Sequence, residues 1–442
     1  MVRLTGIFSK LEPAKVLVIG DLMLDTYTIG KARRISPEAP VAVIHVQSEE
    51  NRPGGAGNVI LNLVSMGAEV IAVGRVGADH AGDLLRKSFE GEGLSTEGLF
   101  VQPNYPTPVK NRIIAENQQI VRIDHEKVLP IPEMLEQQVI ESLPALLKDV
   151  KVVAISDYGK GFLSKTLLSA LIEQAKSLDI PVIADPKGID FSKYQGATIL
   201  KPNLSEAYAA ANLTPDIPLD QAAIRILQLS KAKTLMVTRS EAGISLFHQD
   251  GTRQDYPVRI REVKDVTGAG DTVLAMLSFA IANGLSVGES AQLSNLAAGI
   301  AIERFGCARV TLSDLAWRLL EFDAANKVFD VEHLFALQKA LHGRKVAILG
   351  LNGHKGLSSA IFNTIRQLGH RHDVDLLVYV KDENPSEEFV NILAALHDVD
   401  FIILQGENLR SLCEKIHPEE VYVMEGDKLH KLDGASALVN NA

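Results

Sequence analysis

Length, composition and charge limit what kind of protein this chain can be. Its 442 residues favour two domains, and 46% hydrophobic with 23% charged residues is the composition of a globular protein. The net charge of −10, without a dense block of Lys and Arg, argues against a nucleic-acid partner. The longest apolar helical stretch, residues 273–282, is too short to span a membrane, and two distant cysteines fit a reducing cytoplasm. We therefore expect a cytoplasmic protein with no membrane partner.

The first predicted strand, residues 15–20, is apolar and rich in β-branched residues, as buried parallel strands are. It ends at Gly20-Asp21, and open α/β sheets bind ligands at the carboxyl ends of their strands. Asp21 and Asp25 could therefore accept hydrogen bonds from the hydroxyls of a polyol. The alternative is that one of them only caps a turn.

Residues 41–46 and 109–124 have extended or alternating patterns and are not followed by helices, so they could form a small separate sheet. Between them, a glycine-rich segment at residues 53–58 precedes a helical apolar run. The adjacent Gly54 and Gly55 allow a ligand to approach the backbone, and Asn58 offers a donor and an acceptor. A plain turn before a helix is the alternative.

From residue 152 onward, apolar strands alternate with helices, which predicts a parallel, doubly wound sheet. The expected strands are 152–156, 182–184, 198–200 and 234–237, and the expected helices are 165–178, 204–211 and 219–229. Polar residues follow the strand ends, where a ligand would bind. They are Asp157, Asp185, Lys187, Asn203, Glu206, Thr238, Arg239 and Glu241.

Residues 265–272 (DVTGAGDT) open directly onto an apolar helix. The small residues Gly268, Ala269 and Gly270 leave backbone N–H groups accessible at the positive end of the helix dipole, which suits an anion. Asp271 lies beside this site. A base next to an anion site suits phosphoryl transfer from ATP to an alcohol. Two alternatives are a dinucleotide fingerprint, which would need Gly at Val273, and a solvated helix-start carboxylate.

Residues 324–344 are charged and helical in pattern and are expected to connect two domains. Beyond them, residues 345–352, 374–381, 401–405 and 421–424 are predicted strands with helices between them. This pattern predicts a second, smaller Rossmann-like α/β domain.

Several ordered motifs together resemble the ribokinase-like (PfkB) sugar kinases, most closely the kinase half of the bifunctional heptose-7-phosphate kinase/heptose-1-phosphate adenylyltransferases. They are GDLMLD (20–25), RISPEAPV (34–41), RPGGAGN (52–58), NQQIVRID (117–124), SDYGKG (156–161), DPKG (185–188), PNLSE (202–206), VTRSE (237–241) and DVTGAGDT. The resemblance implies a ribokinase-like doubly wound sheet with a small β lid. The implied domains are a kinase at 1–325, a linker at 326–344 and a nucleotidyltransferase-like domain at 345–442.

The resemblance also implies roles for individual residues. Asp271 would be the catalytic base, with Gly268, Ala269 and Gly270 as the anion hole. The residues expected at the sugar phosphate are Asp21, Gly54, Gly55, Asn58, Lys187 and Arg112. Arg34, Lys110 and Arg122 also lie in or beside the lid and could meet a phosphorylated sugar. Solvated basic side chains on an edge sheet are the alternative.

On the nucleotide side, the NLSE segment resembles a family motif that organises Mg²⁺ and the ATP phosphates. The residues expected at ATP are Asn203, Leu204, Ser205, Glu206, Thr238, Arg239, Glu241 and Asn295. Glu206 would hold Mg²⁺ through water, because Mg²⁺ prefers hard oxygen ligands and retains its waters. Asn203 and Glu206 could equally form a helix capping box, and both roles can hold together. The family's lid is often a dimer surface, so we expect a homodimer.

The second domain departs from the family. After Asn352-Gly353 the chain reads His354-Lys355-Gly356-Leu357, so Leu replaces the second His of the family's H-x-G-H motif. Met424 stands where the late K-G-G-D motif has Lys. Lost positive charge weakens stabilisation of a triphosphate. This domain is therefore expected to be a degenerate transferase with a structural, dimerising or regulatory role.

The sequence thus predicts a sugar kinase dependent on ATP and Mg²⁺. The resemblance implies phosphorylation of D-glycero-D-manno-heptose 7-phosphate at C1, a step toward ADP-heptose and lipopolysaccharide. Three alternatives are a ribokinase-like kinase of another sugar or sugar phosphate, a sugar-responsive regulator without turnover, and a working bifunctional enzyme.

Overall fold

The computed structural model describes residues 7–116, 118–258, 263–320, 327–329, 334–353, 356–371, 373–382, 385–404 and 408–432. Their contacts form two compact units. One unit is residues 14–310, and the other joins the described part of residues 1–13 to that of 311–442. No helix among these residues has the length and apolarity needed to cross a bilayer.

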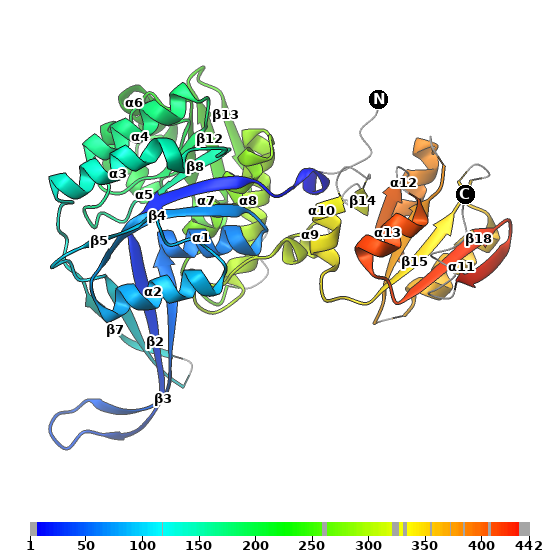
Figure 1. Cartoon of the computed structure of the whole chain (residues 1–442), viewed down its shortest axis with the longest axis horizontal. Helices are drawn as coiled ribbons and strands as arrows, with labels where there is room; N and C mark the ends of the chain where they lie inside the picture. Colours follow the sequence, from blue (N-terminus) through cyan, green and yellow to red (C-terminus); the bar gives the residue numbers. More distant parts are fainter. Residues whose placement is uncertain are drawn as a thin grey trace. The chain divides into compact units, whose positions relative to one another are not determined.

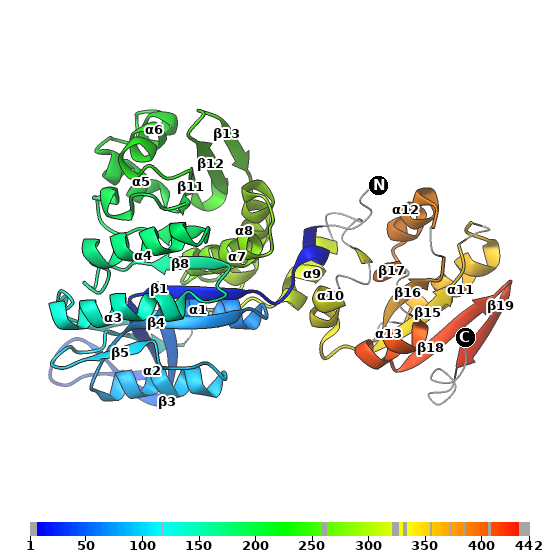
Figure 2. The same ribbon diagram turned by 45° about the horizontal axis from the view of Figure 1, so that its top comes forward.

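The first unit is built on a nine-stranded sheet with the order β13-β12-β11-β10-β9-β8-β1-β4-β5 (Figures 1 and 2). Its strands are β1 (Lys15–Gly20), β4 (Glu69–Gly77), β5 (Leu99–Gln102), β8 (Val152–Ser156), β9 (Val182–Asp185), β10 (Ile199–Leu200), β11 (Thr234–Thr238), β12 (Ile244–His248) and β13 (Arg253–Tyr256). The strands from β5 to β11 pair in parallel, and β12 and β13 extend the sheet antiparallel. The parallel part confirms the predicted doubly wound α/β fold.

Helices cover both faces of this sheet. They are α1 (Ala56–Ser65), α2 (His80–Gly91), α3 (Glu133–Leu146), α4 (Lys165–Ser177), α5 (Leu204–Ala211), α6 (Leu219–Ser230), α7 (Ala269–Ala282) and α8 (Val287–Ile302). Residues of α3, α4 and α6 share one buried cluster with β1 and β8, whereas α1 and α7 contact the same two strands from the other face. Successive strand residues therefore point alternately into two apolar layers, as the continuous apolar strands predict.

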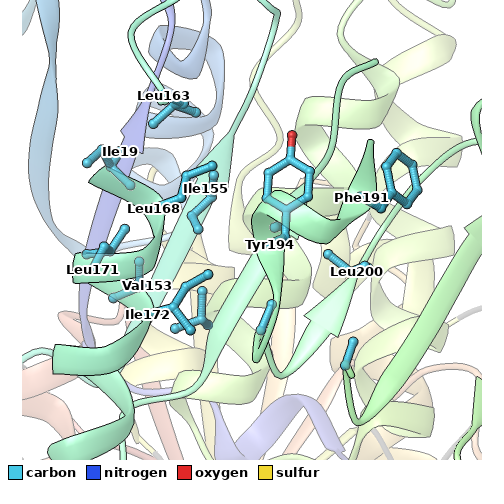
Figure 3. Packing of buried hydrophobic residues seen from close by; sticks show 14 of the residues in the cluster. Ile19, Val153, Ile155, Leu163, Leu168, Leu171, Ile172, Phe191, Tyr194 and Leu200 are labelled. Atoms are coloured by element: carbon cyan, nitrogen blue, oxygen red, sulfur yellow. The ribbon is translucent and has the colours of Figure 1, made fainter. Parts of the chain in front are cut away.

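Figure 3 shows part of the first layer, where Leu168, Leu171 and Ile172 of α4 lie against Val153 and Ile155 of β8. All five side chains are at most 3% exposed. Burial of each such side chain contributes roughly 1.5–3 kcal/mol. Helix α4 begins at Ser164, whose hydroxyl accepts a hydrogen bond from the Leu167 N–H. The layer holds β1 and β8 in place, so that the loops after them meet at one sheet edge.

A separate sheet with the order β3-β2-β6-β7 forms the expected lid. Its strands are β2 (Leu22–Ile35), β3 (Ala42–Gly55), β6 (Val109–Ala115) and β7 (Gln118–His125), and the β2–β3 hairpin projects from the body of the unit (Figure 1). Strand β3 is longer than residues 41–46, because its pairing with β2 continues to Gly55. Apolar side chains of the lid are exposed, among them Ile35, Val41, Val46, Ile120 and Val121.

The second unit has a six-stranded sheet with the order β14-β17-β16-β15-β18-β19. Its strands are β14 (Val328–Phe329), β15 (Val346–Leu351), β16 (Asp375–Val380), β17 (Phe401–Leu404), β18 (Glu420–Glu425) and β19 (Lys428–Leu432), the last antiparallel. Its helices are α9 (Leu312–Leu320), α10 (Leu334–Leu341), α11 (Ser359–Gly369), α12 (Glu387–Ala395) and α13 (Leu409–Ile416). The second α/β domain is thus present.

Along the chain, the division between the two compact units falls after residue 310, before the predicted linker at 326–344. Aromatic contacts explain the difference, because Phe8 and Phe401 both pack against Phe329, and Trp317 packs against Phe401. The 3-10 turn η1 (Ile7–Lys10) and helix α9 therefore belong to the second unit. Strand β14 and helix α10 lie inside the expected linker, and β14 pairs with β17. The extent of the functional domains stays a prediction.

Candidate active site

The conformation of the loop before α7 is fixed by hydrogen bonds of the Asp265 side chain and by the backbone conformation of one glycine. The Asp265 carboxylate accepts hydrogen bonds from the Thr267 N–H and hydroxyl and from the Gly306 N–H. Gly268 is the N-cap of α7 and has a φ of 79°, which side chains rarely tolerate. A Cβ there would lie 2.6 Å from the Asn58 amide nitrogen. A larger residue at this position would clash with the Asn58 side chain, so the loop needs glycine here.

Asp271 lies in the first turn of α7 and is only 4% exposed. Its Oδ2 accepts a hydrogen bond from Asn58 Nδ2 at 2.9 Å, and its Oδ1 accepts one from the Tyr158 hydroxyl at 2.5 Å. Burial raises the pKa of Asp271 to about 6, against the lowering effect of these two hydrogen bonds. A carboxylate with this pKa is ionised at neutral pH yet basic enough to take a proton from an alcohol in a transition state.

The expected anion hole surrounds the start of α7. The first N–H groups of a helix have no partner within it, so they can bind an anion. Here the Ala269 N–H points to the Val266 carbonyl at 3.3 Å, a long contact that an anion could replace. Gly268, Gly270 and Asp271 line one pocket with Lys201. Charge on a transferring group would be stabilised here by amides and by an ammonium together.

Asp21, directly after β1, reaches across to the loop after β8. Its Oδ2 accepts hydrogen bonds from the backbone N–H groups of Tyr158 and Lys160, at 2.9 and 3.0 Å. Among the described residues nothing hydrogen-bonds to its buried Oδ1. Burial and then the nearby Asp157 raise the pKa of Asp21. A buried carboxylate oxygen without a partner is costly, so a hydroxyl of a bound ligand would stabilise it.

Asp25 is tied into the lid. Its Oδ1 forms an ion pair with Arg112 at 2.6 Å, and a Cβ at Gly54 would lie 2.1 Å from its Oδ2. The neighbouring Gly55 has a φ of 58°. At both glycines a Cβ would clash with other parts of the chain, Asp25 at Gly54 and the Asp21 carbonyl oxygen at Gly55, and the approach of a ligand to them stays a prediction.

A pocket of about 210 Å³ lies between the carboxyl ends of β9, β10 and β11 and the start of α7. Two ion pairs lie in it: Lys187 with Glu206 at 2.7 Å and Lys201 with Asp185 at 2.9 Å. Asn203 and Glu206 form the anticipated capping box of α5, whose first turn contains Leu204 and Ser205. The capping role is therefore real, and Glu206 still lines the pocket.

Of the other residues that the sequence assigned to ATP, one lines this pocket and three do not. Thr238 lines the same pocket and forms a β-bridge with Asn203. Arg239 forms an ion pair with Asp255, and Glu241 lies in the 3-10 turn η3 (Ser240–Ala242). Asn295 of α8 donates a hydrogen bond to the Tyr256 carbonyl. The pocket is not lined by these last three residues, so their contact with ATP stays a prediction.

Sequence reasoning gave no role to two residues of this site. Tyr158 contacts the predicted base, and its only signal was its place in the SDYGKG motif after a strand. Lys201, 2% exposed, follows β10 immediately before the PNLSE motif. Both residues follow the carboxyl ends of strands, and the rule that ligands bind at these ends is the one that identified their neighbours. A tyrosine there is equally compatible with packing, and a buried lysine cannot be distinguished from a surface lysine by pattern alone.

In the second unit, the corresponding sheet edge lies after β15. The Gly353 N–H donates to the carboxylate of Asp382, which is buried at the end of β16. Leu357 packs against the core of the unit, and Met424 is buried and accepts a contact from the Thr364 hydroxyl. His354 and Lys355 lie outside the described residues. Among the described residues, the Asp382 carboxylate and the apolar Leu357 and Met424 lie in this region, and Lys381 follows β16 directly.

Comparison with known proteins places these features in a family. The sequence profile described as "pfkB family carbohydrate kinase" matches residues 13–314. The chain is 40% identical to the "Bifunctional protein HldE" of Geotalea uraniireducens over 96% of its length and 90% of the relative. It is also 40% identical to that of Geobacter sulfurreducens, over 97% and 91%. The structure of Arabidopsis thaliana ribokinase complexed with ribose and ATP matches 70% of this chain and 99% of that one, with a TM-score of 0.56 and 20% identity.

Proposed function

Because the chain belongs to the pfkB family of carbohydrate kinases, we propose that it phosphorylates D-glycero-D-manno-heptose 7-phosphate at C1, using ATP. The observation that carries the reaction type is the buried Asp271 at the start of α7, beside N–H groups that can bind an anion. Support for the sugar comes from the motifs that resemble heptose-7-phosphate kinases and from the similarity to the HldE proteins along nearly the whole chain.

In the proposed mechanism, Asp271 is the general base. One carboxylate oxygen takes the proton of the C1 hydroxyl while the sugar oxygen forms a bond to the γ-phosphorus of ATP. The bond between that phosphorus and the bridging oxygen of ADP breaks, and ADP leaves with the electron pair. Asn58 and Tyr158 orient the carboxylate through their hydrogen bonds. The amides at Gly268, Ala269 and Gly270, with Lys201, stabilise the charge on the transferring group.

The pocket of about 210 Å³ would hold the phosphates of ATP with their Mg²⁺. Glu206 and Asn203 offer the hard oxygen atoms that Mg²⁺ prefers, through water. No group of three or more His, Cys, Asp or Glu side chains that could hold a metal ion occurs in the described part of the chain. Mg²⁺ would neutralise phosphate charge during transfer. Lys187, half-exposed and paired with Glu206, can turn toward either substrate.

The sugar would bind between the sheet edge and the lid, with hydroxyls on Asp21 and on the backbone near Gly54 and Gly55. Lid closure would exclude water, which otherwise competes as an acceptor. The exposed apolar residues of the lid, such as Val46 and Ile120, fit a homodimer formed through this sheet. We propose that the reaction takes place in the cytoplasm, where ATP is available and where free cysteines such as Cys307 and Cys413 stay reduced.

The test is ³¹P NMR of the purified protein with ATP, Mg²⁺ and D-glycero-D-manno-heptose 7-phosphate. The expected result is a new anomeric phosphate signal that grows in step with ADP, while the signal of the original phosphate persists. Absence of transfer from a correctly folded protein would contradict the proposed substrate. Parallel reactions with ribose and fructose 6-phosphate then show whether another sugar is the acceptor.

A further inference from the structure

Lys110 is a basic residue of the lid that lies beside the proposed acceptor site. It belongs to β6 and pairs in register with Asp25 of β2. Its ammonium nitrogen lies 5.8 Å from the centre of the Tyr158 ring, within the range of a cation–π contact. The side chain is half-buried. Lys110 therefore points toward the site and not into open solvent.

The neighbouring cations already have carboxylate partners. Arg112 pairs with Asp25 at 2.6 Å, Lys160 with Glu126 at 2.7 Å, and Arg122 with Asp124 at 2.8 Å. In the pocket at the start of α7, Lys187 and Lys201 are paired as well. Within the ranges that the structure describes, no ion pair within 4.0 Å includes Lys110. Among these side chains, its charge is the one left to be matched by a ligand.

The surroundings also make this unmatched charge unfavourable. Burial and then the positive charge of Lys160 lower the pKa of Lys110 and so disfavour its ammonium form, and this effect exceeds the opposite effect of the Glu126 and Asp25 carboxylates. An anion bound beside Lys110 would reverse both effects, since it would replace lost solvation and offset the repulsion. A phosphate monoester is suited to this, because its oxygens accept several charge-assisted hydrogen bonds.

The position of Lys110 relative to Asp271 sets which phosphate it can meet. Tyr158 lies between them, with its hydroxyl on Asp271 and its ring beneath the Lys110 ammonium. A sugar with its reacting hydroxyl at Asp271 would extend past this ring toward Lys110. We propose that Lys110 binds the phosphate that the sugar already carries, and so selects phosphorylated over unphosphorylated acceptors. This inference rests on the proposed function and deepens it.

The experiment compares the wild type with Lys110→Met, Lys110→Arg and the control Lys31→Met, an exposed lysine of the same lid. Each is assayed with D-glycero-D-manno-heptose 7-phosphate, with the unphosphorylated heptose, and with the pair mannose 6-phosphate and mannose. Lys110→Met should raise the KM for the phosphorylated sugar about 10- to 100-fold. The KM for ATP and the turnover of the unphosphorylated sugars should change less than about twofold, and Lys110→Arg should recover part of the loss.

Calorimetric titration of each variant with the same sugars, and with inorganic phosphate as a probe, gives binding constants that do not depend on turnover.

An unchanged KM for the phosphorylated sugar in Lys110→Met would overturn the inference. An equal loss for both members of a pair would also overturn it, because that is the result of a structural role. A raised KM for ATP would assign Lys110 to the nucleotide phosphates instead. If the wild type ignores the heptose phosphate but prefers mannose 6-phosphate to mannose, and Lys110→Met loses that preference, the proposed substrate fails and the role of Lys110 stands.

Discussion

The Tyr158 hydroxyl lies 2.5 Å from Asp271 Oδ1 and donates a hydrogen bond to it, although 113 residues separate the two in the sequence. The Asn58 amide fixes the other carboxylate oxygen. The bond from Tyr158 favours the ionised carboxylate and so lowers a pKa that burial raises. We therefore propose that Tyr158 positions the Asp271 carboxylate and adjusts its basicity.

The first prediction concerns the pH dependence of turnover. As the proposed base, Asp271 would act only when ionised, so kcat should rise with pH through a value of about 6 and then level off. Tyr158→Phe removes the hydrogen bond and should raise the pKa of Asp271. The acid limb should then move up by about one to two pH units, since such bonds contribute about 1.5–3 kcal/mol and one pKa unit is about 1.36 kcal/mol.

The control for this variant is Tyr208→Phe, because the Tyr208 hydroxyl donates to the Ile217 carbonyl away from the site. Its pH profile should match that of the wild type. Identical acid limbs in Tyr158→Phe and Tyr208→Phe would show that the tyrosine does not adjust the base.

The second prediction tests the base itself. Asp271→Asn keeps the size of the side chain, and its carbonyl can still accept a hydrogen bond from Tyr158, but it cannot take a proton. We expect kcat to fall by about 10²- to 10⁴-fold, with little change in the dissociation constant of ATP measured by calorimetry. Asp83→Asn, in the first turn of α2 and exposed, is the matched control. Turnover near that of the wild type in Asp271→Asn would remove Asp271 from its proposed role.

The third prediction concerns Gly54. An added Cβ would lie 2.1 Å from Asp25 Oδ2, so Gly54→Ala should push the Asp25 carboxylate out of its ion pair with Arg112. We expect the KM for the sugar to rise at least about tenfold and the protein to lose about 1–3 kcal/mol of stability. Gly91→Ala has open space around the new methyl group and should leave both quantities nearly unchanged. Urea unfolding and steady-state kinetics of the two variants provide the comparison.

Much of the fold and part of the site could be predicted because their signals are local. The apolar run of β1 and the strand–helix alternation after residue 152 predicted the parallel sheet. The start of α7 was evident from three small residues before an apolar helix, and this placed Asp271 in its first turn. Because ligands bind at the carboxyl ends of parallel strands, Asp185, Asn203 and Glu206 were expected to lie together, and they line one pocket.

What sequence reasoning did not find depends on contacts between distant segments. Arg112 was expected to meet the substrate, but the pairing of β2 with β6 brings it to Asp25, and its contact with the sugar stays untested. The first residues join the second unit because Phe8 packs against Phe329, and no local pattern indicates that contact. Asn295 was placed by resemblance alone, whereas its amide binds the Tyr256 carbonyl.

The fourth prediction concerns the second unit, which we expect not to transfer an adenylyl group. Leu357 packs against its core, and the Gly353 N–H, at the edge where a nucleotide would bind, donates a hydrogen bond to the Asp382 carboxylate. Each lost electrostatic contact to a transition state costs about 10²- to 10³-fold in rate, and a nearby carboxylate adds repulsion. With heptose 1-phosphate and ATP, pyrophosphate release should therefore stay at background. The Asp271→Asn variant is the decisive sample, because it should lower ADP formation by the kinase about 10²- to 10⁴-fold and leave the second unit intact. Sustained pyrophosphate release from that variant, with ADP-heptose visible by ³¹P NMR, would mean that the second unit works without the missing His and Lys.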